Sequence, residues 1–153
     1  MEMALIAPVF LLLIFGVIEL GTMLHLNTVL DGAVQDAGRV IRTGAAQQSA
    51  SALTTFRTKL CDKLPSAVNC ASVATDVRAF PNFNAVSLPP ALGAGGTPST
   101  TFIPGTAGSI VTIRALYRYE FSTPFIGHLL SGDGSNGRWL MSTIVFRNEP
   151  FGS

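Results

Sequence analysis

Hydrophobic residues are concentrated at the N-terminal end of the chain. Residues 3–18 read MALIAPVFLLLIFGVI, and the nearest charges are Glu2 before this run and Glu19 after it. As a helix this run is about 24 Å long, which is short for a bilayer crossing, whereas extension through LGTMLHLNTVL to residue 30 gives about 42 Å. The pattern therefore predicts a hydrophobic helix over residues 1–30 that lies in a membrane or packs among copies of itself.

Two other interpretations of this run fit the sequence less well. A helix that is apolar on all faces is buried in a globular core only when more protein surrounds it than this chain provides. A secretory signal peptide carries basic residues before its apolar run and a small-residue cleavage site after it. Here the first basic residue is Arg39, and no such site closes the run. We therefore expect a chain whose basic leader has been removed and whose apolar helix is retained.

Beyond Leu20 the apolar positions recur on one side only. They return at alternating steps of four and three residues, which is the period of a helix, with polar and charged residues between them. The set is Leu26, Leu30, Ala33, Ala37, Val40 and Gly44, and the pattern resumes after TGAAQQSASA with Leu53, Phe56 and Leu60. We therefore expect one long helix from the N-terminus to about Lys59, with Pro8 and Gly44 as the points where it can kink or loosen.

After Cys70 the hydrophobic period changes to two, as in strands. Strands are predicted at residues 73–80, 109–121 and 139–147. The middle strand alternates: Val111, Ile113, Ala115, Tyr117, Tyr119 and Phe121 share one face, and Thr112, Arg114, Arg118 and Glu120 share the other, which we expect to be solvated. Residues 81–108, rich in Pro, Gly, Ser and Thr, predict a long exposed loop.

A small antiparallel sheet with one apolar face needs a cover, and the amphipathic half of the helix can provide it. The predicted fold is therefore α+β, with a long N-terminal helix packed on a small antiparallel sheet. Residues 1–30 form the hydrophobic segment, and residues 31–153 form one head that includes the amphipathic half of the helix. The sequence contains no internal repeat and no sign of a second globular domain.

The two cysteines, Cys61 and Cys70, are separated by eight residues. They cannot complete a four-thiolate metal site, and the two histidines, His25 and His128, lie far away in the sequence. A disulfide that closes a short loop is the preferred interpretation, and it would place the head in an oxidising compartment. Two buried thiols in a cytosolic protein are the alternative.

Charge and motifs give little support for catalysis or for nucleic-acid binding. The formal net charge is +1, so there is no basic excess to neutralise phosphates. His128, Asp133 and the serines lack a GxSxG elbow around a serine nucleophile, and GDGSNG lacks the Lys-Ser/Thr of a phosphate-binding loop. We therefore expect no enzyme activity, no cofactor and no metal.

Two carboxylates adjoin the apolar run. Glu2 stands directly before it, where a carboxylate is costly to bury unless a cation such as an N-terminal amine meets it. Glu19 interrupts the apolar sequence, and two interpretations are open. It either pairs with Arg39 or Arg42 of another subunit, or it marks the wet boundary of the membrane segment.

The first forty residues resemble a known family. Glu2, the following ALIAPVFLLLIFGVIELG with Pro8 and FGVIELG as its most specific features, and the helical AGR around Gly38 are similar to the TadE-like family. These proteins are pilins and pseudopilins of the tight-adherence (Flp, type IVb) pilus. The closing VFRNEPF (residues 145–151) and the paired cysteines also resemble the family, whereas the middle of the chain does not.

The resemblance implies a precursor that a prepilin peptidase cuts and that the pilus assembly machinery extracts from the inner membrane into a helical filament. It implies that Glu2 pairs with a neighbouring N-terminal amine, although here the glutamate stands second and the family pattern places it fifth. Independently of the resemblance, the small residues Gly16 and Gly21 would allow close approach between helices.

We therefore predict a structural pilus subunit that polymerises through its hydrophobic helix and displays its head. It would span the inner membrane once, with the head on the periplasmic side, and then become part of an extracellular homo-oligomeric filament. Two alternatives stay open. The chain could be a low-copy minor pilin that primes or tips the pilus, or a membrane-anchored envelope domain that binds a ligand through the loop at residues 81–108.

Overall fold

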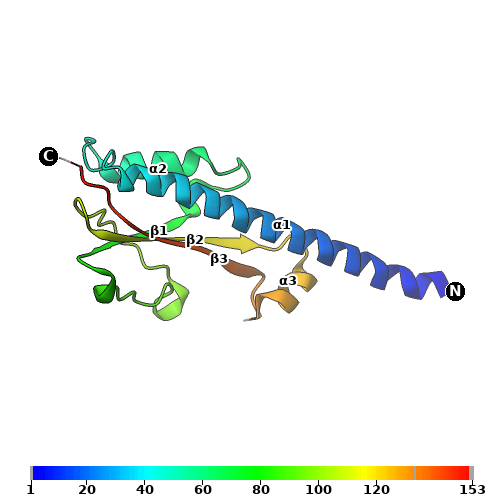
Figure 1. Ribbon diagram of the computed structural model, residues 1–153. Coiled ribbons are helices and arrows are strands. Elements are labelled where there is room, and N and C mark those ends of the chain that lie inside the picture. The colour runs from blue at the N-terminus through cyan, green and yellow to red at the C-terminus, as the bar shows by residue number, and fades with distance from the viewer. Residues whose placement is uncertain (1, 133, 152–153) are drawn as a thin grey trace. The chain divides into compact units, whose positions relative to one another are not determined.

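A computed structural model describes residues 2–132 and 134–151. Its main elements are α1 (Glu2–Arg42), α2 (Ala52–Asp62), β1 (Ala74–Phe80), β2 (Ile110–Glu120), α3 (Pro124–Ser131) and β3 (Gly137–Arg147), with 3-10 turns at Cys70–Ser72, Phe83–Ala85 and Ala94–Gly96 (Figure 1). The strands form one antiparallel sheet in the order β1-β2-β3. The predicted α+β class, with a long N-terminal helix packed on a small antiparallel sheet, is confirmed.

The chain divides into two compact units, which we describe separately. The stem unit comprises Met1–Thr28 and Arg118–Leu140, and the head unit comprises Val29–Tyr117 and Met141–Ser153. The sequence predicted a single head over residues 31–153. The structure instead groups residues 118–140, which include α3, with the N-terminal part of α1.

The prediction that α1 continues to about Lys59 is wrong, because α1 ends at Arg42. Gly44 adopts a left-handed conformation with a φ of +79°. Its amide donates to the carbonyl of Ile41 at 3.1 Å, and the amide of Ala46 donates to the carbonyl of Val40 at 3.0 Å, so the last turn of the helix is closed. Turns then lead to α2, which the side chain of Ser51 caps. The helix therefore ends before Gly44 and does not merely loosen there.

Replacement of two glycines, one after the end of α1 and one inside it, by alanine should change the stability of the chain in opposite directions. A Cβ at Gly44 would lie 2.3 Å from Cγ of Phe151, whereas a Cβ at Gly32, inside α1, meets nothing within 4 Å. Gly44→Ala should destabilise the chain by at least about 1–2 kcal/mol, because a left-handed backbone disfavours a side chain. Gly32→Ala should stabilise it by about 0.5–1 kcal/mol, because alanine is the better helix former. Denaturant unfolding in detergent measures both, and a Gly44→Ala protein as stable as the wild type would contradict this account.

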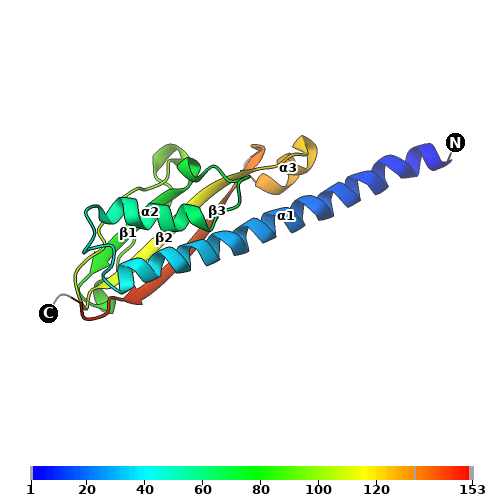
Figure 2. The ribbon, with the colours of Figure 1, turned by 90° about the horizontal axis from the view of Figure 1, so that it is seen from above.

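Within the head unit, the C-terminal part of α1 and all of α2 cover one face of the sheet (Figures 1 and 2). A Cβ at Gly38 would lie 2.6 Å from Cδ1 of Ile144 on β3 and 3.2 Å from Cε1 of Phe146, so helix and strand approach closely at this glycine. Buried apolar residues of the head unit include Leu30, Ala33, Val34, Ala37, Ile41, Phe56, Leu60, Val77, Val111, Ile113 and Ala115. The apolar faces predicted for α1 and for β2 in this unit therefore form the core.

The opposite face of β2 departs from the prediction. Thr112 and Arg114 were expected in solvent, but both are buried. The segment between β1 and β2 lies on the side of the sheet away from α1 and α2 (Figure 1), and the carbonyl of its Pro89 accepts a hydrogen bond from Nη1 of Arg114. It is irregular, as predicted, but it is not simply exposed: the amide of Val77 donates to the carbonyl of Thr101 at 2.7 Å, and the amide of Ile103 donates to the carbonyl of Val77 at 2.8 Å. A short parallel bridge therefore joins the loop to β1.

The stem unit contains a helix that the sequence reasoning missed. The eight residues of α3, PFIGHLLS, are mostly apolar and too few to show a helical period. The boundary signals are nonetheless present, with Pro124 at the first turn and Gly132 at the C-terminal cap with a φ of +77°. A proline and a glycine eight residues apart were the available evidence for this helix.

Candidate assembly surface

Apolar side chains cover the N-terminal part of α1 and face outward. Among the described residues, Ile6–Arg42 is a helix long and apolar enough to cross a membrane, with a mean hydropathy of 2.2 over its most apolar window. Only 6% of that window is buried within the protein. The exposed large apolar residues here, which we call the apolar surface, are Met3, Ile6, Val9, Phe10, Leu11, Leu12, Leu13, Ile14, Phe15, Val17, Ile18, Leu20 and Leu24. A surface of this size requires lipid or protein around it.

Glu2 and Pro8, two of the predicted assembly residues, lie in the first turns of α1. The backbone of Glu2 belongs to α1, but its side chain lies outside the described part of the chain. Pro8 lies inside α1, which continues through it. Because proline lacks an N–H group, the helix loses one backbone hydrogen bond in this turn. Pro8 is exposed and belongs to the same outward-facing region.

The two predicted small-residue positions have different surroundings. A Cβ at Gly16 would lie 3.8 Å from Cδ1 of Ile126, so this glycine faces α3 of its own chain. A Cβ at Gly21 would meet nothing within 4 Å, and Gly21 is exposed. Of the two, only Gly21 leaves open space beside the helix for another molecule.

Glu19 is buried within the stem unit, with only 6% of its surface exposed. The backbone N–H of Ser122 donates to its Oε1 atom at 2.5 Å, and the hydroxyl of Tyr119 donates to the same atom at 3.4 Å. The ring of Tyr119 packs edge-on against Phe121 at a centroid distance of 5.2 Å. The carboxylate of Glu19 is therefore satisfied inside its own chain and not by water, whereas its level relative to a membrane stays a prediction.

Arg42, one of the two arginines suggested as intermolecular partners of Glu19, also has a partner within the head unit. Nε of Arg42 lies 3.1 Å from Oε1 of Glu149, and the carbonyl of Arg42 accepts a hydrogen bond from the amide of Glu149 at 2.9 Å. These contacts tie the end of α1 to the segment after β3. They give the closing RNEP sequence a structural role in the head.

The predicted disulfide is present between Cys61 and Cys70, whose Cα atoms lie 5.6 Å apart. Cys61 is in the last turn of α2, and Cys70 begins the 3-10 turn that leads into β1. The bond therefore fixes the end of α2 to the start of the sheet.

A buried charge cluster beneath the long loop was not predicted. Asp76 on β1 and Arg114 on β2 are directly opposite each other on neighbouring strands, with Nη2 of Arg114 2.5 Å from Oδ2 of Asp76. Nε of Arg78 donates to both carboxylate oxygens of Asp76, at 3.0 and 3.1 Å. The sequence signal was the D-x-R pattern on one strand and an arginine on the next, which place all three on one sheet face once the register is known.

Both arginines of this cluster also hold the loop. Nη1 of Arg114 donates to the carbonyl of Pro89 at 2.7 Å. Nη2 of Arg78 donates to the hydroxyls of Ser99 at 3.2 Å and Thr101 at 3.1 Å. The cluster therefore fixes the Pro/Gly-rich loop on the sheet.

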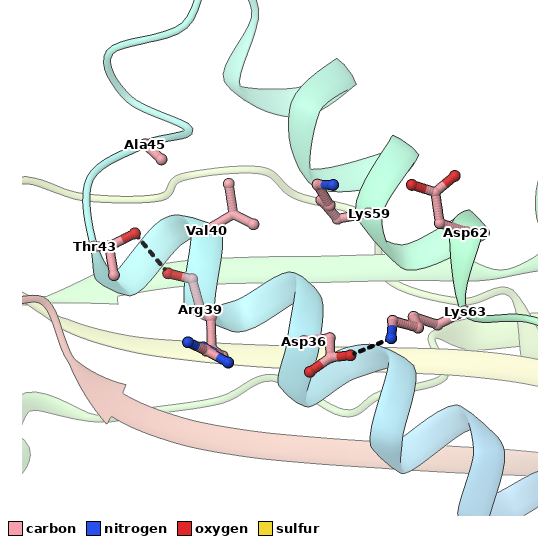
Figure 3. Close-up of a pocket in the computed structure, with 8 residues that line it drawn as sticks. All are labelled: Asp36, Arg39, Val40, Thr43, Ala45, Lys59, Asp62 and Lys63. Atoms are coloured by element: carbon pink, nitrogen blue, oxygen red, sulfur yellow. Dashed lines mark hydrogen bonds and ion pairs between the residues drawn. The ribbon is translucent and has the colours of Figure 1, made fainter.

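A shallow hollow of about 370 Å³ lies between α1 and α2 in the head unit (Figure 3). Its charged residues are of both signs, and Nζ of Lys63 reaches Oδ2 of Asp36 at 3.1 Å. The lining residues are Asp36, Arg39, Val40, Thr43, Ala45, Lys59, Asp62 and Lys63. No nucleophile paired with a base lines it, and no group of His, Cys, Asp and Glu within the described residues could hold a metal ion.

Comparison with known proteins bears on the N-terminal segment. Residues 1–39 match the family model described as TadE-like protein. Over these residues the chain is similar to the TadE-like family. The resemblance inferred from the sequence is thereby confirmed over the apolar surface, Glu19 and the AGR motif in which Gly38 contacts β3. No curated protein and no solved structure matches the chain.

The similarity to TadE-like proteins over residues 1–39 suggests an association with the Tad pilus system. The family is not an enzyme family. By its length and composition, the apolar N-terminal helix is able to serve as a membrane anchor.

Proposed function

We propose that this protein is a structural subunit of a Tad-type pilus, which polymerises through the apolar surface of α1 and displays its head. The observation that carries the proposal is a TadE-like helix whose large apolar side chains face outward along its N-terminal half. The disulfide-linked head supports it, because such a bond persists in an oxidising compartment outside the cytoplasm.

The apolar surface is compatible with two environments. Before assembly it would lie in the inner membrane, and in the filament it would pack against the same surface of other copies. The apolar surface is not exposed to water when a stem moves from lipid into a bundle of stems. Association of the stems is then favoured by close packing at small residues. The resulting filament is a homo-oligomer that the pilus machinery would assemble after a prepilin peptidase has cut the precursor.

Individual residues have different roles in this scheme. Glu2 would meet the N-terminal amine of a neighbouring subunit, and Gly21 would provide a close-packing position between stems. Pro8 would set the local geometry of α1 where the stems meet. Gly16 and Glu19 contribute indirectly, because both face residues 118–140 of their own chain.

Gly21 provides a direct test of the packing role. Gly21→Leu should leave the folded chain intact, because its Cβ position is open, but it should block filament formation by separating the stems. Gly32→Leu is the matched control, since Gly32 is also an open, exposed glycine of α1 but lies outside the apolar surface. Electron microscopy of cells that carry each variant measures filament number, and unfolding in detergent checks the fold.

Normal filaments in the Gly21→Leu strain would contradict the packing role of Gly21. If Gly32→Leu and Gly21→Leu reduced filament number equally, the effect would not be specific to the apolar surface. The copy number of the subunit in sheared fibres distinguishes a filament-forming pilin from a low-copy minor pilin that primes or tips the pilus.

A further inference from the structure

We propose that α3 is an interfacial membrane anchor, which lies at the bilayer surface beside α1 and extends the membrane-embedded length of the protein past Glu19. This inference rests on the proposed function, in which α1 is inserted in the inner membrane before assembly. The partner is the lipid bilayer itself, at the level where acyl chains meet headgroups.

The exposed face of α3 is the first observation. Phe125 and Leu129 lie four residues apart on the short helix, and 61% and 67% of their surfaces are exposed. Ile126, between them in sequence, is buried and points toward Gly16 of α1. One side of α3 therefore packs on α1 and another presents two large apolar side chains outward.

The backbone of α3 is held by contacts with Asn136. Nδ2 of Asn136 donates to the carbonyl of Phe121 at 2.8 Å, and the amide of Phe121 donates to the carbonyl of Asn136 at 3.0 Å. A Cβ at Gly127 would lie 2.0 Å from Oδ1 of Asn136, so α3 is pressed against this residue. The exposure of Phe125 and Leu129 is thus a property of a fixed helix.

The length of the apolar surface is the second observation. Residues 3–18 span about 24 Å as a helix, which is less than the roughly 30 Å of a bilayer's hydrocarbon core. Residues 3–24 span about 33 Å, which is sufficient, but this longer stretch includes Glu19. The bilayer can cover it only if the carboxylate of Glu19 is kept from lipid.

The stem unit meets this requirement. Ser122 and Tyr119 donate hydrogen bonds to Glu19, and little of its surface is exposed. Residues 118–131 thus shield Glu19, which is the one charged residue in the longer stretch. The same segment leaves Phe125 and Leu129 exposed. Because α3 lies beside α1 within the same compact unit (Figure 2), the lipid that surrounds α1 would also reach the exposed side chains of Phe125 and Leu129.

Phenylalanines of similar exposure allow a matched test. Phe10 on α1, Phe83 in the loop of the head unit and Phe125 on α3 are 60%, 65% and 61% exposed. Trp139 is the sole tryptophan of the chain, so each of F10W, F83W and F125W is made in a W139F background as a single probe. If W139F impairs folding, the probes are read with Trp139 retained, by subtraction of the wild-type signal.

The full chain is reconstituted in phosphatidylcholine vesicles whose lipid is brominated near the headgroup end of the acyl chains, and tryptophan quenching is compared with that in unbrominated vesicles. F10W should be quenched, F125W should lose a comparable share of its fluorescence, and F83W should lose none. The F125W signal should not change when the protein is diluted in lipid.

Each other outcome has a definite meaning. If F10W is quenched but F125W behaves like F83W, α3 is not an anchor, and membrane insertion of α1 still stands. If F10W is also unquenched, membrane insertion fails, and the proposed function fails with it. A second measurement uses acrylamide, which quenches tryptophan from the aqueous side. If F125W is protected from acrylamide only at high protein density, and brominated lipid does not quench it, a second copy of the chain covers α3. That result would overturn the lipid proposal.

Discussion

Asp76→Ala is expected to lower the free energy of unfolding by about 3–5 kcal/mol, because it leaves a buried arginine without its counter-ion. The carboxylate of Asp76 is fully buried and contacts both Arg78 and Arg114. Its loss also frees the two arginines that hold the carbonyl of Pro89 and the hydroxyls of Ser99 and Thr101. The long loop should therefore become accessible to proteases as the head loses stability.

Asp36→Ala is the matched control for this change. Asp36 also pairs with a cation, Lys63, at 3.1 Å, but its side chain is 45% exposed. A solvent-exposed pair contributes about 0–1 kcal/mol, so the control should unfold almost as the wild type does. Denaturant unfolding and limited proteolysis in detergent measure both variants, and equal stability of the two would show that the buried cluster does not hold the head together.

Removal of the disulfide should have the second-largest effect. Replacement of Cys61 and Cys70 by serine should destabilise the head by about 2–3 kcal/mol, because the bond closes a short loop that is otherwise free in the unfolded chain. The bond links the last turn of α2 to the turn before β1, so α2 should be the first element to open. Amide hydrogen exchange in α2 would show this local opening.

Reductant provides the internal control for the disulfide. Adding it to the wild-type protein should lower the unfolding midpoint toward that of the double-serine variant, and the variant itself should not respond. A wild type insensitive to reductant, with both thiols free by mass spectrometry, would contradict the assigned bond and the oxidising compartment it implies.

Much of the fold follows from the sequence because its signals are local. The period of two located all three strands to within two residues, as β2 at Ile110–Glu120 shows. The short spacing of Cys61 and Cys70 was compatible with a loop-closing disulfide, which is present. The uncharged run over residues 3–18 predicted the apolar part of α1, because its apolar side chains follow one another without a charge.

The errors arose where tertiary contacts override local pattern. Gly44 was read as a weak point in a continuing helix, but Phe151, from the far end of the chain, occupies the space of its missing side chain. Arg114 was placed in solvent because alternation alone cannot show that a distant loop covers the second face of the strand. Arg114 is buried because Asp76 neutralises it across the sheet.

Contacts between residues distant in the sequence also explain why the surroundings of Glu19 in the stem unit were not predicted. A carboxylate such as Glu19 reads as a boundary in the sequence, since its donors, Tyr119 and Ser122, stand about one hundred residues away. The helix α3 that follows them is too short for a periodic signal, although its proline and glycine boundaries were visible. The assembly residues stay predictions, because polymerisation concerns contacts between copies and the structure holds one chain.

The most direct measurement of the central claim is immunogold electron microscopy of filaments sheared from cells, with an antibody raised against the disulfide-linked head. If the protein is a structural subunit of the filament, gold should decorate the filaments at many positions along their length, and the sheared fraction should contain the chain in bulk. Filaments that carry no label, with the protein entirely retained in the membrane fraction, would contradict the account.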